Sequence, residues 1–136
     1  TVGKLVAFHS RYKFLVMAHS PVAYRELGRL VAQAKLFAPD ELAQRYLLDL
    51  MQALKQQATR KQQANVLMHL QGFFKKMLSS EAKQELLKLI HKYRQGHLPL
   101  LAPLTLLRHH LAQHPHQYVA AQQYLQPFPD ELGLRA

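Results

Sequence analysis

The sequence predicts an all-α protein, a compact bundle of six to seven helices with short loops. Three observations predict it. Apolar side chains recur at helical spacing along most of the chain, helix-capping residues stand between those stretches, and no alternating segment flanks an Asn-Gly or Asp-Gly turn. With 136 residues, 49% of them hydrophobic, residues 1–136 fit a single helical domain.

The first two helices are expected over residues 2–19 and from residue 21 to about residue 35. Ser20 is a natural N-cap between them, and Pro21 suits the first position of the second helix. Residues at helical spacing predict the buried stripe of the first helix, namely Leu5, Phe8, Tyr12, Leu15 and His19.

Asp40 is expected to cap a third helix that runs to about residue 58, in which Leu42, Tyr46, Asp49 or Leu50, and Ala53 continue a period near 3.6. Thr59 is expected to cap a fourth helix with the apolar stripe Leu67, Leu70, Phe74 and Met77. Ser79 or Ser80 begins a fifth helix, which Gly96 ends. Pro103 begins a sixth, a short seventh covers residues 117–126, and residues 127–136 are expected to form a tail.

The net charge is the first functional signal. Eighteen Lys and Arg against eight Asp and Glu give +10 with neutral histidines. Residues 1–35 contribute +5 and residues 55–97 contribute +7, whereas residues 36–54 are acidic and residues 98–136 are neutral. So large an excess suits a polyanionic partner, with nucleic acid first and an anionic membrane surface second. No apolar run has the roughly 20 residues of a membrane helix, so we expect no membrane-spanning segment, and with nucleic acid favoured we expect no membrane partner.

The predicted fourth helix concentrates this charge on one face. Spacings of three and four place five residues opposite its apolar stripe, namely Lys61, Asn65, His69 (or Met68), Gly72 and Lys76. The segment between Gln52 and Ser80 contains no acidic residue, so no ion pair within the helix offsets its cations. A glycine inside a helix costs about 1 kcal/mol relative to alanine. Close approach of another backbone, from the protein or from a ligand, would explain Gly72.

Catalytic motifs are missing. The chain has no cysteine, no glycine-rich phosphate loop and no His-Glu-x-x-His motif, and its carboxylates form no evident pair. His110 and His114 share a helix face and are weak candidates for a metal site, but surface histidines are the more ordinary interpretation. We therefore expect no cofactor and no catalysis by this chain alone.

Several stretches resemble a known bacterial domain. They are Phe8-His9-Ser10-Arg11-Tyr12-Lys13, Ala18-His19-Ser20, Leu27-Gly28-Arg29, Asn65-Val66-Leu67-Met68-His69-Leu70-Gln71-Gly72-Phe73-Phe74-Lys75-Lys76, Tyr93-Arg94-Gln95-Gly96 and Pro103-Leu104-Thr105-Leu106-Leu107-Arg108-His109-His110. Together they resemble the YbgA-like domain, long described as of unknown function. The blocks at residues 65–76 and 103–110 are the most specific, and the resemblance spans nearly the whole chain.

The resemblance implies a connection with transfer RNA. YbgA-like domains occur alone and fused behind thiouracil-desulfidase (TudS-like) domains, whose iron–sulfur cluster removes sulfur from thiolated uracil. In the fused proteins the substrate is thiouridine in transfer RNA, and the YbgA-like part is thought to bind the RNA. The cluster's cysteines belong to the other domain, so the resemblance implies a desulfidase partner for this chain.

Charge and resemblance lead to one hypothesis: a cytoplasmic, non-catalytic domain that binds RNA, with transfer RNA favoured. The expected contacts are Arg11, Lys13, Arg60, Lys61, Asn65, His69, Lys75, Lys76, Arg94, Arg108 and His109. Lys and Arg would hold phosphates, and Asn65 and His69 would reach sugar or base edges. The alternative is a protein-interaction domain that docks a separate desulfidase or DNA-repair enzyme, which a contiguous exposed apolar patch would favour.

Overall fold

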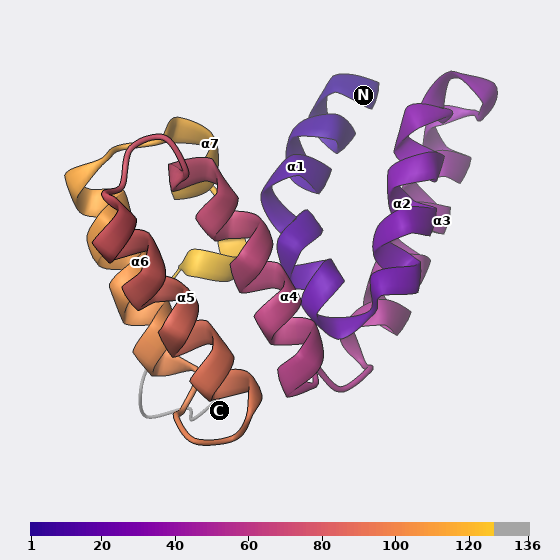
Figure 1. The fold of residues 1–136 in the computed structure, drawn as a ribbon. Helices are drawn as coiled ribbons and strands as arrows, with labels where there is room; N and C mark the ends of the chain where they lie inside the picture. The colour runs from indigo at the N-terminus through magenta and orange to yellow at the C-terminus, as the bar shows by residue number, and fades with distance from the viewer. Residues whose placement is uncertain (127–136) are drawn as a thin grey trace.

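The computed structural model describes residues 1–126, and these residues form α-helices and 3₁₀ turns only (Figure 1). The α-helices are α1 (Val2–His19), α2 (Pro21–Ala32), α3 (Pro39–Leu54), α4 (Arg60–Gln71), α5 (Ser80–Arg94), α6 (Leu101–Gln113) and α7 (Gln117–Ala120). The 3₁₀ turns are η1 (Ala34–Leu36), η2 (Gly72–Phe74) and η3 (Gln123–Leu125). The predicted all-α bundle is confirmed, and the tail predicted at 127–136 lies outside the described residues.

Helices α1 and α4 lie between two groups of helices. Helices α2 and α3 pack on one side, and α5, α6 and α7 lie on the other (Figure 1). Helix α1 contacts α2, α3, α4 and η3, while α4 contacts α1, α5 and α6. No helix in residues 1–126 is long and apolar enough to cross a membrane.

Three helices begin at the residues that the sequence predicts. The Ser20 hydroxyl accepts a hydrogen bond from the Ala23 amide at 3.1 Å, and the Ser79 hydroxyl accepts one from Ala82 at 3.1 Å. Thr59 caps α4 through a capping box. Each cap satisfies an amide that the first helical turn leaves without a partner. The predicted end of α5 is also confirmed, because Gly96 has a φ of 85°, which suits glycine.

Other predicted boundaries are wrong. Asp40 does not cap α3; the helix begins at Pro39 after Ala38, and Asp40 lies in its first turn. Helix α3 ends at Leu54 instead of near residue 58, and α6 begins at Leu101 instead of Pro103. Two expected helices are interrupted: the second gives way to η1 after residue 32, and the seventh to η3 after residue 120.

Helix α4 also ends earlier than its apolar spacing predicts. It stops at Gln71, and the chain continues through η2 instead of a further helical turn. Lys76 therefore lies beyond the helix and does not continue the face of Lys61 and Asn65. No atom of a neighbouring residue would come within 4 Å of a Cβ placed on Gly72, so close approach of the protein's own backbone does not explain this glycine.

The apolar stripe predicted for α1 is wrong because this helix has neighbours on several sides. Its buried residues are His9, Phe14, Val16, Met17 and Ala18, whereas Phe8 is exposed and the rest of the predicted stripe is half-buried. Phe14, Met17 and Ala18 belong to a larger core with α4, α5, α6, α7 and η3. Val16 belongs to a second core with α2 and α3. A central helix buries more than the single stripe of a surface helix.

Candidate nucleic-acid interface

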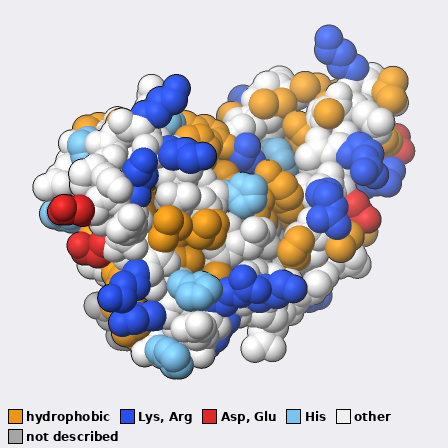
Figure 2. Space-filling view, viewed as in Figure 1, with side chains coloured by type: hydrophobic (Ala, Val, Ile, Leu, Met, Phe, Trp, Pro, Cys, Tyr) orange, Lys and Arg blue, Asp and Glu red, His pale blue; other side chains and the backbone are white. Residues whose placement is uncertain are grey.

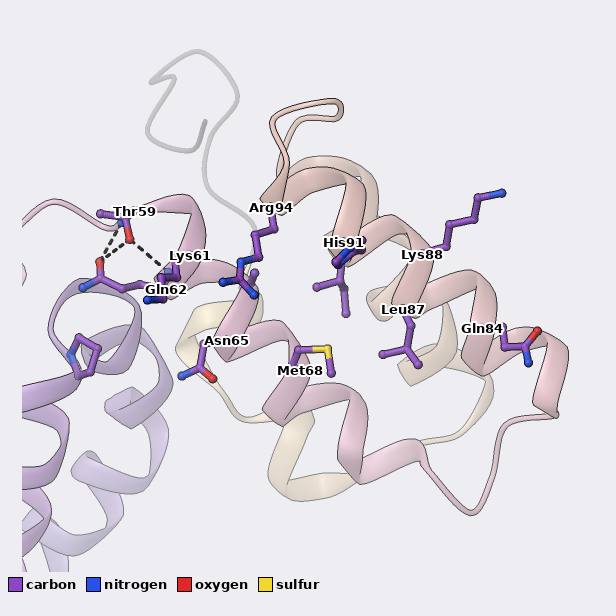
Figure 3. Close-up of a pocket in the computed structure, with 13 residues that line it drawn as sticks. Thr59, Lys61, Gln62, Asn65, Met68, Gln84, Leu87, Lys88, His91 and Arg94 are labelled. Atoms are coloured by element: carbon purple, nitrogen blue, oxygen red, sulfur yellow. Dashed lines mark hydrogen bonds between the residues drawn. The ribbon is translucent and has the colours of Figure 1, made fainter.

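A groove of about 830 Å³ runs between α4 and α5 (Figure 3). Helix α4 contributes one side through residues spaced three and four apart, namely Lys61, Asn65 and Met68. Helix α5 contributes the other through Gln84, Leu87, Lys88, His91 and Arg94. These spacings place each set on one helix face, so the packing of α4 against α5 lines both faces along the same groove.

The lining combines an apolar floor with a basic rim. The apolar members are Pro21, Ala64, Met68, Leu87 and Ile90, and the basic members are Lys61, Lys88, His91 and Arg94. No acidic residue is among the described residues that line the groove. Figure 2 shows the same kind of face, with apolar side chains in the middle of the α4–α5 half, Lys, Arg and His side chains around them, and acidic side chains at its outer edge. The arrangement suits an anion that carries an apolar part.

Hydrogen bonds fix one end of this groove. The amide oxygen of Gln62 accepts from the Thr59 amide at 2.9 Å and from the Thr59 hydroxyl at 3.0 Å, which holds the start of α4. The Arg60 guanidinium donates to the carbonyl oxygens of Tyr93 at 2.9 Å and Leu98 at 3.2 Å. It also lies 5.0 Å from the centre of the Tyr93 ring. Arg60 thus ties the start of α4 to the end of α5.

The structure brings three of the predicted RNA contacts together in this groove: Lys61, Asn65 and Arg94. His69 lies on α4 but lines a separate small hollow of about 230 Å³, together with Phe14, Tyr24, Gly72 and Phe73. Arg11, Lys75, Lys76 and His109 are exposed and do not line the groove.

Three other predicted contacts are engaged within the protein. Arg60 binds the two carbonyl groups described above. The Arg108 guanidinium donates to the Leu125 carbonyl at 2.9 Å, and burial lowers the pKa of Arg108. The Lys13 ammonium lies 5.1 Å from the Tyr118 ring centre and 5.5 Å from that of Phe14. Part of the binding capacity of these side chains is therefore used in packing the helices.

Sequence reasoning missed the α5 side of the groove apart from Arg94. Gln84, Lys88 and His91 recur at spacings of four and three, which would have identified a polar helix face. That pattern does not tell which helix lies across from this face, because many solvent-exposed helix surfaces have the same pattern. Only the packing of α4 on α5 places it across from Asn65 and Met68.

The histidines near the end of α6 do not assemble a metal centre. His110 is buried, and neither ring nitrogen has a hydrogen-bond partner among the described residues. Burial, followed by the charge of His109, lowers the pKa of His110. Across residues 1–126, no three His, Cys, Asp or Glu side chains come close enough together to hold a metal ion, so no third ligand of these types joins His110 and His114 there.

Comparisons with known proteins give the family. The chain is 38% identical over 136 residues to the uncharacterized protein YbgA of Escherichia coli strain K12, an alignment that covers 99% of this chain and 80% of YbgA. No solved structure matches the chain significantly. Residues 13–129 match the family described as "Protein of unknown function (DUF1722)". This chain therefore belongs to the DUF1722 family and has a YbgA-like domain.

Proposed function

We propose that this protein is a cytoplasmic RNA-binding domain and that the α4–α5 groove is the centre of its RNA contact surface. The observation that carries the proposal is the lining of the groove, where a basic rim surrounds an apolar floor and none of the described lining residues is acidic. RNA is a polyanion whose bases have apolar faces, so it matches both parts of the lining.

In this proposal the basic residues of the groove contact the RNA backbone. Lys61, Lys88 and Arg94 bind phosphates, and the imidazole of His91 can donate a further hydrogen bond to the RNA backbone. The exposed Lys75 and Lys76 extend the basic surface beyond η2. The net charge of +10 steers RNA toward the protein and adds non-specific affinity.

The resemblance to YbgA-like domains narrows the proposed ligand to transfer RNA and the proposed process to thiouridine desulfuration. The chain has no cysteine, so the iron–sulfur cluster of a desulfidase cannot be held by its own thiolates. In this proposal the domain binds the transfer RNA without catalysing the reaction, and a desulfidase, fused or separate, carries out the chemistry.

The test is binding of total transfer RNA to the full chain at low and high salt. Affinity should fall with a logarithmic slope of about 0.7–0.9 for each phosphate neutralised. Replacing Lys61 and Arg94 by alanine should weaken binding and reduce the slope by roughly 1.4–1.8, the share of two phosphates. Replacing the exposed Arg25 and Arg29 of α2 by alanine removes the same charge away from the groove and should change the slope less.

No binding at low salt would refute the proposed function. Equal losses from the two double variants would refute the groove as its centre, because affinity would then follow net charge alone. Replacing Lys75 and Lys76 by alanine tests the extended surface, which is disproved if transfer RNA binds that variant as tightly as the unchanged protein.

One observation favours a second candidate function, docking of a separate desulfidase or DNA-repair enzyme. Three apolar residues on the outer face of α3 are largely exposed: Leu47 by 54%, Leu48 by 60% and Met51 by 54%. The surrounding segment 36–54 is the acidic part of the chain, which suits a protein better than RNA. A partner that co-purifies through nuclease and high salt, and is lost in Met51→Glu, would establish this function.

A further inference from the structure

The groove between α4 and α5 has a feature that phosphate binding alone does not need. Three carboxamides line it: Gln62 and Asn65 from α4, and Gln84 from α5. A phosphate only accepts hydrogen bonds, so lysine and arginine are sufficient to bind it. A carboxamide both donates and accepts, as the edge of a nucleobase does, and Asn and Gln pair with such edges.

Neighbouring contacts set which groups these carboxamides offer. The oxygen of Gln62 is already used twice by the capping box, so this side chain offers its NH₂ group as a donor. The Nδ2 of Asn65 lies 3.8 Å from the sulfur of Met17, so its oxygen is the better group for a ligand. The α4 side therefore combines a donor and an acceptor one helical turn apart.

The floor suits a flat ring. Met68 of α4 and Leu87 of α5 lie across the groove from each other (Figure 3), and Met68 is 43% exposed. Thioether and branched aliphatic side chains pack against either face of an aromatic ring. Arg94 can add its planar guanidinium at the end of the groove near Lys61. The described lining contains no Phe, Tyr or Trp, and the imidazole of His91 is its one aromatic ring, so the contact would be made mainly with aliphatic side chains.

We propose that the α4–α5 groove binds a single unpaired nucleotide, with the base between Met68 and Leu87 and its phosphates on Lys61 and Arg94. The groove volume of about 830 Å³ falls within the usual range for small-ligand sites. Packed helices lie only about 8–10 Å apart, so a double helix cannot enter between them. This inference rests on the proposed function and narrows it from RNA in general to an unstacked nucleotide.

The experiment compares a short single-stranded RNA with a blunt-ended RNA duplex on the full chain at low salt. Met68→Glu places a carboxylate in the floor and should weaken single-strand binding about tenfold or more, with little effect on the duplex. Met68→Ala removes the packing surface without adding charge and should weaken single-strand binding severalfold. Leu36→Glu is the control, since it adds the same charge at an apolar side chain that is 78% exposed in η1 and does not line the groove, and it should bind like the unchanged protein.

The outcomes separate this inference from the proposed function. If neither RNA binds the unchanged protein, the proposed function fails and the nucleotide site fails with it. If both RNAs bind but Met68→Glu and Leu36→Glu lose equal affinity, or duplex and single strand respond alike, only the nucleotide site fails. Binding of an acidic amphipathic peptide that depends on Met68 and that RNA does not displace would assign the groove to a protein helix and overturn the inference. Thermal unfolding of each variant verifies that it is folded.

Discussion

The buried pair formed by His9 and Tyr46 shows how single residues link the fold to pH. His9 Nδ1 lies 2.8 Å from the Tyr46 hydroxyl, across α1 and α3. Burial raises the pKa of Tyr46 to about 12, so the phenol keeps its proton, and its hydroxyl can donate a hydrogen bond to His9 Nδ1 when the neutral imidazole has its own proton on Nε2. Burial, with a smaller effect of Lys13, lowers the pKa of His9 below its ordinary value of 6.5. Folding therefore favours the neutral form.

Because burial lowers the pKa of His9, we predict that acid destabilises the protein through this residue. Below about pH 6.5 the unfolded chain takes up a proton that the folded His9 resists, so the free energy of unfolding falls by at most about 1.4 kcal/mol per pH unit for this proton. The stabilisation is complete above pH 6.5 and is lost as the pH falls. Urea unfolding measures the free energy of unfolding at about pH 7.5 and about pH 5.5. The decrease between the two pH values should be smaller for His9→Gln than for the unchanged protein. The exposed His97, replaced in the same way, should leave the loss unchanged.

Arg60 is a second case in which one residue serves the fold. Its guanidinium reaches two carbonyl groups and covers the Tyr93 ring, a geometry that a lysine ammonium cannot reproduce. Arg60→Lys keeps the charge, so we predict a loss of stability of about 1 kcal/mol. Thermal unfolding measures it, with exposed Lys61→Arg as the charge-conserving control. Equal stability of Arg60→Lys and the unchanged protein would contradict the clamping role.

At the scale of elements, local interactions could be predicted and tertiary ones could not. The caps at Ser20, Thr59 and Ser79 depend on residues three positions away, so the sequence is sufficient to find them. The early end of α4 depends on how Phe74, completely buried, enters the larger core through η2. Helical spacing continues past that point in the sequence, and so it predicted a longer helix.

Gly72 lies at that transition and allows a direct test. Its backbone is right-handed helical, with φ of −57°, and a Cβ there would meet no neighbouring atom within 4 Å. We predict that Gly72→Ala raises the free energy of unfolding by roughly 0.4–1 kcal/mol, because alanine restricts the unfolded chain. Urea unfolding measures the change. Gly96→Ala is the opposite control, since a φ of 85° makes alanine destabilising there. A destabilised Gly72→Ala would show a steric constraint that the fold does not reveal.

At the scale of the molecule, the sequence predicted the sign and the chain position of the charge but not the surface it forms. Lys61, Asn65 and Arg94 come together because α4 packs on α5, whereas Arg60 and Arg108 are engaged by backbone carbonyls. Composition cannot distinguish a lysine at a groove from an arginine that closes a loop. That distinction requires the contacts across elements that are distant in the sequence.

The two cores share α1, so we expect residues 1–126 to unfold as one cooperative unit. Phe14 and Met17 of α1 lie in the larger core and Val16 lies in the smaller one, so the α2–α3 pair cannot separate without disturbing a helix that the other core needs. We predict that Leu27→Ala, in α2 and 1% exposed, lowers the stability of the entire chain by about 2–5 kcal/mol. Hydrogen exchange should then accelerate in α5 and α6 as much as in α2 and α3, because all these amides exchange through global unfolding. Faster exchange confined to α2 and α3 would show instead that the smaller core opens alone, which would leave the α4–α5 groove intact on a partly unfolded chain.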